Sequence, residues 1–185
     1  MSLDGLNPSG YTSAALYKKE NTMVSENLKK ELNDQIRDEL ASAYAYLAMS
    51  LWAQSENFDG IARFFEVQSG EERAHARKFM NMLIDLGERV VIQEMKQPES
   101  HFASVREVFE SALKHEQFIT FRIHHLMGIA QKENAFEVQG MLQWFVDEQI
   151  EEENTMIKIL AKLDLIGENK GLLLMLDREL GSRGE

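Results

Sequence analysis

Residues 65–86 read FEVQSGEERAHARKFMNMLIDL, and their order of apolar and polar side chains is the strongest indication of the fold. Its apolar side chains recur about every three or four residues, which is the spacing of one face of an α-helix. Two polar residues, Glu72 and His75, interrupt that face near its middle. Side chains three positions apart are neighbours on a helix surface, and carboxylate and imidazole groups both bind metals. The stretch therefore predicts a long helix that carries a polar site on its buried face.

The same helical period appears in three further long stretches and in one short one. We expect helices from the N-cap Ser25 to about Ser55, from the turn at 57–60 to about Leu86, from Ser104 to about Lys132, from about Ala135 to Leu165, and from about Gly171 to Leu180. Ser104 and Glu107 form a capping box at the start of the third helix. Gly87 and Gly167 are natural stops for the second and fourth helices.

The connection at 88–103 predicts how the helices are arranged. It has no helical period and contains Pro98. Its residues can span roughly 53 Å, whereas a helix of about 28 residues is about 42 Å long. The turns after the first and third helices are short, so each of those pairs is expected to be antiparallel. We therefore expect an all-α fold, a ferritin-like four-helix bundle with one long crossover and a short fifth helix.

The fifth helix is expected to leave this bundle. Gly167 allows the chain to turn away, and residues 172–180 are too apolar all round for a solvated terminal helix. With the core already filled by four helices, other copies of the chain would cover it. Residues 1–22 are different: they mix Gly, Ser, Asn and Pro without a period and resemble a cloning linker. We therefore expect a tag-like extension over 1–22 and one domain over 23–185, with Met23 as the natural start.

Composition excludes several classes of function. The chain has no cysteine, which rules out disulfides, thiolate zinc sites and iron–sulfur clusters. Its formal net charge of −11 disfavours nucleic acid and anionic membranes and favours cations. The most apolar run, 43–53, is far shorter than the roughly 20 residues of a membrane span. With no signal peptide recognisable, we expect a cytoplasmic protein that binds neither membrane nor nucleic acid.

Each of the four long helices has a glutamate in its apolar face, near the middle. These residues are Glu39, Glu72, Glu116 and Glu152. Helix midpoints lie at one height in such a bundle, so four carboxylates would converge in the core, where unpaired charges are costly. Protonation or bound cations would relieve that cost. His75 offers a further ligand, and residues 147–153 hold five carboxylates without a Lys or Arg. A pair of bound metal ions explains the whole pattern with one assumption. A carboxylate-rich site with a single imidazole suits iron or manganese better than soft metals.

The alternative explanation is structural. A Glu-x-x-His pair on its own is usually a surface feature, and a run of glutamates late in a helix is usually a solvated face. A single glutamate within the apolar face of a helix can also mean that a different face of that helix is the buried one. Four such interruptions at matching heights, together with His75, are much harder to explain in this way.

Several motifs support a resemblance to a known family. They are Asn33-Asp34-Gln35, Glu71-Glu72 with His75, Lys114-His115-Glu116, Leu142-Gln143-Trp144-Phe145, Glu148-Gln149 and Leu176-Asp177-Arg178-Glu179-Leu180. With these motifs, residues 25–181 resemble the ferritins, in particular the bacterial and archaeal non-haem branch. The general carboxylate bundle carries Glu-x-x-His on two helices. Here the second position reads Glu152-Glu153-Asn154-Thr155, and the missing histidine is itself typical of ferritins.

The resemblance implies the following roles. One iron ion would be held by Glu39, Glu72 and His75, and Glu72 would bridge it to a second. The second ion would be held by Glu116 and Glu152, with Gln149 alongside. Glu71, Glu148, Glu151 and Glu152 match a third iron site of this branch. Tyr46 matches a tyrosine beside the di-iron centre that can donate an electron, and its spacing of seven from Glu39 puts both on one helix face.

The implied activity is iron storage with ferroxidase chemistry. Ferrous iron would be oxidised by oxygen or peroxide and deposited as a mineral inside a hollow shell of 24 subunits. No haem is expected, because bacterioferritins bind it through a methionine directly after the second-helix glutamate, where this chain has Arg73. Met49 and Met80 leave only an unusual binding mode open.

Three other functions are alternatives to iron storage. A rubrerythrin-like peroxidase would need a cysteine-rich electron-transfer domain, and the chain has no cysteine. A DNA-protecting mini-ferritin builds its site between subunits and lacks the fifth helix. A plain helical interaction protein is the third alternative.

Overall fold

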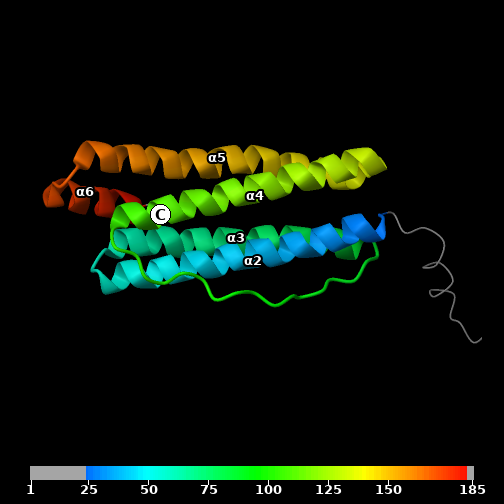
Figure 1. Ribbon diagram of the computed structural model, residues 1–185, viewed down its shortest axis with the longest axis horizontal. Coiled ribbons are helices and arrows are strands. Elements are labelled where there is room, and N and C mark those ends of the chain that lie inside the picture. Colours follow the sequence, from blue (N-terminus) through cyan, green and yellow to red (C-terminus); the bar gives the residue numbers. More distant parts are fainter. Residues whose placement is uncertain (1–23, 183–185) are drawn as a thin grey trace, which may run out of the picture.

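The computed structural model describes residues 24–182. This part of the chain consists of α2 (Glu26–Ser55), α3 (Asp59–Asp85), α4 (Val105–Glu133), α5 (Phe136–Ile166) and α6 (Lys170–Gly181). Figure 1 shows α2 beside α3 and α4 beside α5, each pair joined by a short turn. The all-α bundle with a short fifth helix is confirmed. The linker assigned to 1–22 and the start at Met23 lie outside the described residues.

The helix ends follow the local chemistry of the sequence. Ser25 accepts a hydrogen bond from the Leu28 N–H, and Ser104 accepts one from the Glu107 N–H. Gly87 and Gly167 both have positive φ, of 77° and 55°, which glycine adopts without strain. The second helix starts earlier than expected, at Asp59, so the turn before it is shorter than 57–60. Within 24–182, no helix is both long and apolar enough to cross a membrane.

The connection between α3 and α4 runs along the length of the bundle, beside α2 (Figure 1). Side chains of α2 hold it there. The Val91 N–H donates to Asn33 Oδ1 at 2.7 Å, and Gln93 Nε2 donates to Asp34 Oδ1 at 2.9 Å. Arg37 donates to Gln93 Oε1 at 3.2 Å. The crossover thereby starts α4 at the same end of the bundle as α3, as its length predicted.

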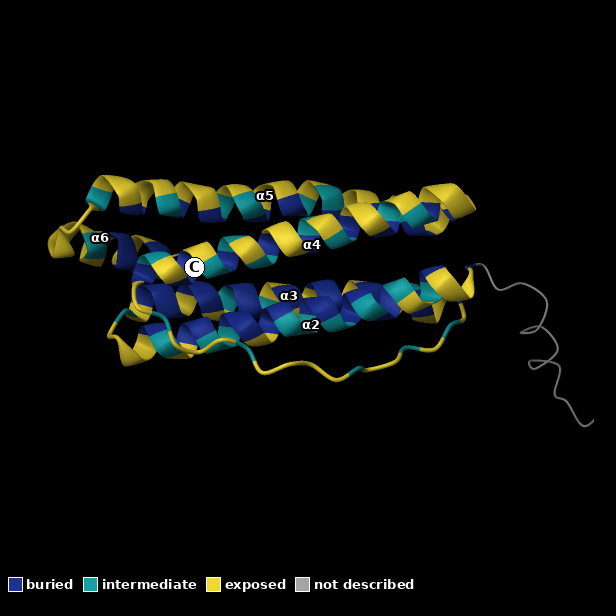
Figure 2. Ribbon diagram, viewed as in Figure 1, coloured by how far each residue is buried: buried dark blue, intermediate teal, exposed yellow. Residues whose placement is uncertain are grey.

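The core consists of two apolar clusters with a polar band between them. One cluster includes Tyr46, Phe65, Ala112 and Met156, and the other includes Ile36, Phe79, Ile119 and Phe145. In every long helix, the central glutamate lies between the residues that belong to one cluster and the residues that belong to the other. The inward faces of all four helices are buried through this band as well as through the clusters (Figure 2). The bundle thus buries a layer of carboxylates between two layers of hydrocarbon.

The position of α6 corrects the sequence prediction in part. This helix does not simply turn away from the bundle, because it packs against the start of α3. Asp177 Oδ1 accepts a hydrogen bond from the Ile61 N–H at 2.8 Å, and Phe58, the N-cap residue of α3, provides no side-chain bond of its own. Leu176 and Leu180 are buried in the bundle core. The apolar pattern shows only that this helix needs a cover. It does not show that the start of α3 in the same chain provides part of that cover.

Gly60 makes this contact possible. A Cβ at Gly60 would lie 1.7 Å from the carbonyl oxygen of Asp177, and one at Gly181 would lie 2.9 Å from the Gly60 Cα. The two backbones therefore touch with no space for a side chain.

We predict that Gly60→Ala displaces α6 and lowers the free energy of unfolding by about 1–3 kcal/mol, the usual cost of overpacking. Gly128→Ala is the matched control, because a Cβ at Gly128, on α4, meets nothing within 4 Å. That change should raise stability by roughly 0.5–1 kcal/mol, since alanine favours the helix. Urea unfolding of the three proteins measures both effects. Equal stability of the two variants would contradict the close contact.

Candidate metal centre

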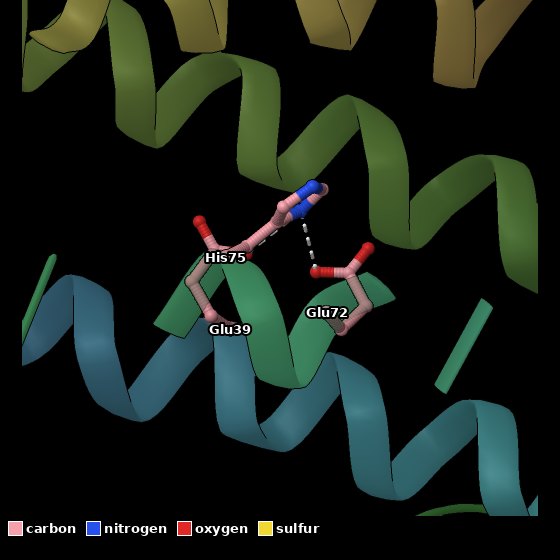
Figure 3. A group of neighbouring side chains, drawn as sticks. All are labelled: Glu39, Glu72 and His75. Atoms are coloured by element: carbon pink, nitrogen blue, oxygen red, sulfur yellow. Dashed lines mark ion pairs between the residues drawn. The ribbon is translucent and has the colours of Figure 1, made fainter. Parts of the chain in front are cut away.

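Glu39, Glu72 and His75 meet in the middle of the bundle (Figure 3). Glu39 comes from α2, and α3 supplies the other two from adjacent turns of one face. One ligand atom of each residue lies within 4.8 Å of those of the other two. His75 Nδ1 is 3.5 Å from Glu72 Oε2 and 4.0 Å from Glu39 Oε2. The structure brings these three together, and their role as ligands stays a prediction.

Glu116 of α4 lies beside Tyr46 and Gln149, and it is fully buried. The Tyr46 hydroxyl donates a hydrogen bond to Glu116 Oε1. Gln149 Nε2 donates to the other carboxylate oxygen, Oε2, at 3.1 Å, and also to the backbone oxygen of Glu116 at 3.2 Å. Glu116 therefore has a fixed orientation, and the expected tyrosine and glutamine both lie next to it.

Two buried amides that the sequence did not indicate as functional hold two of the other three central glutamates. Gln68 Nε2 donates to Glu152 Oε2 at 3.1 Å, and Gln35 Nε2 donates to Glu39 Oε1 at 2.8 Å. Each amide lies about one helical turn from a glutamate of its own helix, Gln68 from Glu72 and Gln35 from Glu39. That spacing is the signal that could have found them. This spacing is a weak signal in the sequence, because glutamine is common on helix surfaces.

The expected third-site residues lie further out than the di-iron ligands. Glu71 and Glu151 are exposed and Glu148 is half-buried. Glu148 Oε1 is 4.0 Å from His75 Nε2, and Glu71 Oε2 accepts a hydrogen bond from Gln68 at 2.8 Å. Glu71 and Glu148 thus extend the buried cluster toward the surface of the subunit, whereas Glu151 makes no contact with it among the described residues.

Burial raises the pKa of all four central glutamates. Burial is the largest cause for each of them. The negative charge of Glu72 further raises the pKa of Glu39, and the negative charge of Glu116 further raises the pKa of Glu72 and of Glu152. The pKa values of Glu39 and Glu72 lie well above the ordinary range, that of Glu116 is raised, and that of Glu152 is raised to about 8. Without a cation, Glu152 therefore retains its proton at neutral pH, and burial shifts the pKa of the other three carboxyls in the same direction.

The donor set suits a hard divalent cation. Glu39 Oε2, Glu72 Oε2 and His75 Nδ1 are buried and have no hydrogen-bond partner among residues 24–182. Buried polar atoms are nearly always hydrogen-bonded, so three such atoms facing one another need an explanation. A bound cation would explain these unpartnered atoms, because its positive charge would attract all three of them. Carboxylates with one imidazole and no thiolate favour iron or manganese.

Comparison with known proteins agrees with this geometry. The sequence model of the ferritin-like domain matches residues 29–166. The chain belongs to the ferritin family. It is 39% identical over 160 residues to a probable bacterial non-haem ferritin-like protein of Haemophilus influenzae, covering 86% of this chain and 97% of the relative. It is 36% identical to the bacterial non-haem ferritin of Staphylococcus aureus, over 87% of this chain and 97% of the relative.

Solved structures of ferritins match this ferritin closely as well. An open-pore ferritin from the archaeon Archaeoglobus fulgidus superposes with a TM-score of 0.86 at 39% identity, covering 88% of this chain and 99% of the other. A humanized archaeal ferritin gives a TM-score of 0.85 at 41% identity, over 86% and 97% of the two chains. The resemblance inferred from the motifs is thus confirmed at the level of sequence and of fold.

The raised pKa values predict how the stability of the metal-free protein depends on pH. A carboxyl whose pKa is higher in the folded state than in the unfolded chain stabilises the fold at low pH, and this contribution is lost as pH rises toward the folded value. For Glu152 the loss occurs between about pH 4.5 and about pH 8. We predict that Glu152→Gln, without metal, gains up to a few kcal/mol relative to wild type across this window.

Denaturant unfolding at several pH values in the presence of a chelator tests this prediction. Glu151→Gln is the matched control, because Glu151 is exposed on the same helix. A constant difference between wild type and Glu152→Gln over the whole window would show that Glu152 is not held protonated.

Proposed function

We propose that this ferritin stores iron and oxidises it from Fe(II) to Fe(III) at a di-iron centre within each subunit. The observation that carries the proposal is the buried cluster of Glu39, Glu72 and His75, with its three unpartnered ligand atoms, next to Glu116 and Glu152. One chain supplies every member of this set. That favours a ferritin over a mini-ferritin, whose site lies between subunits.

The geometry supports a role for each side chain. The Glu72 carboxylate lies 3.5 Å from His75 Nδ1, and the negative charge of Glu116 helps to raise the pKa of Glu72. Glu72 thus interacts with a residue of each half of the cluster. It is therefore the candidate bridge between two ferrous ions. Binding of two divalent cations would displace the protons that the buried glutamates hold. Each ferrous ion then gives up one electron, and oxygen or peroxide is the expected acceptor.

Tyr46 is the candidate for a transient electron donor. Its hydroxyl donates a hydrogen bond to Glu116, and its ring is buried and stacks on Phe65 with centroids 5.9 Å apart. Burial and the charge of Glu116 raise the pKa of Tyr46 well above its ordinary value, which keeps the phenol protonated. A phenol next to a carboxylate can pass its proton to that carboxylate while an electron leaves the ring.

The outer carboxylates are the candidates for a third iron site. Glu71, Glu148 and Glu151 are all at least partly exposed, and buried Glu152 adjoins them. An ion that leaves the di-iron centre on this side would meet oxygen ligands on its way to the surface. Hard oxygen ligands suit ferric as well as ferrous iron.

We further propose that the chain assembles into a hollow shell, the 24-subunit form that the resemblance implies. Leu165 is 88% exposed, and Met175 and Leu174 are 64% and 51% exposed. Leu165, Leu172 and Met175 line an open groove of about 570 Å³ between the end of α5 and α6. Apolar surface of this kind marks a contact between proteins. Although α6 packs on α3, its other face is left for neighbouring copies.

We predict that Glu72→Ala abolishes fast oxidation of ferrous iron, because Glu72 is the only residue proposed to bridge both ions. The fold should persist, and the metal-free melting temperature should hold or rise, since one buried carboxylate is removed. Stopped-flow spectroscopy with two ferrous ions per subunit measures the rate. Glu151→Ala is the control and should keep the first turnover but alter later ones. Oxidation by Glu72→Ala at the wild-type rate would refute the di-iron assignment.

We predict that the full-length protein sediments as a large, hollow particle at micromolar concentration and moderate salt. A variant without residues 168–185 should lose much of this assembly, because the apolar face of α6 is then missing. Its bundle should stay helical, although it also loses the cap that Asp177 provides for α3. Analytical ultracentrifugation with circular dichroism measures both properties. A monomeric full-length chain would refute the shell.

A further inference from the structure

Gln68 lies where the buried centre meets its outer carboxylates. It is on α3, one turn before Glu72, and only 2% of it is exposed. Its Nε2 donates one hydrogen bond to Glu71 Oε2 at 2.8 Å and one to Glu152 Oε2 at 3.1 Å; Glu152 Oε1 is 3.4 Å away. The amide nitrogen therefore faces both carboxyl groups, and an oxygen of each accepts a hydrogen bond from it. One buried amide thus connects carboxylates of two helices.

The two carboxylates differ in their surroundings. Glu152 is 7% exposed and belongs to the buried layer, whereas Glu71 is exposed at its outer edge. Under the proposed function, Glu152 is shared between the di-iron centre and the third iron site. The orientation of this one side chain therefore affects both sites, and Gln68 is the described residue that donates a hydrogen bond to it.

We propose that Gln68 is a positioning residue that couples the third iron site to the di-iron centre, by holding Glu71 and Glu152 toward one cation. This inference rests on the proposed function. A carboxylate offers about four acceptor positions, so a hydrogen bond to Gln68 leaves positions free for a metal ion. Hydrogen bonds that orient metal-binding carboxylates reduce the freedom lost on binding, and removing such a partner typically weakens metal affinity about 10–100-fold.

Gln35 provides the matched comparison. It is also a fully buried glutamine, and its Nε2 donates to Glu39 Oε1 at 2.8 Å. Glu39 belongs to the histidine side of the centre and not to the third site. Loss of the Gln35 amide should therefore weaken the di-iron centre alone, whereas loss of the Gln68 amide should weaken the third site most.

The test is calorimetric titration of the metal-free, full-length protein with Zn²⁺, which binds without being oxidised. Gln68→Leu and Gln68→Met remove the amide at similar volume, so either variant serves if the other does not fold. Glu151→Ala identifies the binding step that belongs to the third site, and Gln35→Leu is the control. We expect the third-site dissociation constant to rise at least about tenfold in the Gln68 variants and to stay within about twofold of wild type in Gln35→Leu.

Two results would overturn the inference. One is a third-site dissociation constant in both Gln68 variants that is within about twofold of wild type. The other is an equal loss in Gln35→Leu, which would mean that any buried amide has the same general effect. Failure of the proposed function has a different signature: wild type and Glu72→Ala would then bind Zn²⁺ alike, with no metal held in the buried cluster.

Discussion

The burial of four carboxylates at one level of a helical bundle is the constraint on which the rest of this structure depends. An uncompensated buried charge costs several kcal/mol, so the layer needs protons or cations. The apolar clusters on either side keep it in place. Phe79 and Phe145 stack with centroids 4.3 Å apart on one side, and Phe65 and Phe109 lie 4.9 Å apart on the other. The hydrocarbon layers provide the stability that the carboxylate layer lacks.

The connections of the bundle determine whether the glutamates meet. The long crossover starts α4 at the same end as α3, and its hydrogen bonds to Asn33 and Asp34 fix its path along α2. At the other end of α2, α6 caps α3 through Asp177 and touches Gly60. Because the four long helices have similar lengths, of 30, 27, 29 and 31 residues, a residue near the midpoint of each comes to a similar height. Topology thereby turns four separate glutamates into one cluster.

Much of this could be predicted from the sequence, because each helix repeats the same simple pattern. The period and the end signals placed every helix within a few residues, and the glutamate that interrupts each stripe located the buried layer. The contact of α6 with Gly60 could not be predicted, since it depends on two backbones that approach only in the folded protein. Gln68 and Gln35 were missed as functional residues for a similar reason. A glutamine is informative only once its partners, here Glu152 and Glu39, are known to be buried beside it.

Anomalous diffraction would show whether the carboxylate layer is a metal centre. Crystals would be soaked with ferrous iron under anaerobic conditions and measured at the iron edge. We expect two strong peaks roughly 3.5–4 Å apart, with Glu72 between them and His75 beside one. A weaker third peak is expected beside Glu152 on its outer side. If crystals that hold iron elsewhere show no peak inside the layer of Glu39, Glu72 and Glu116, the layer is not a metal centre.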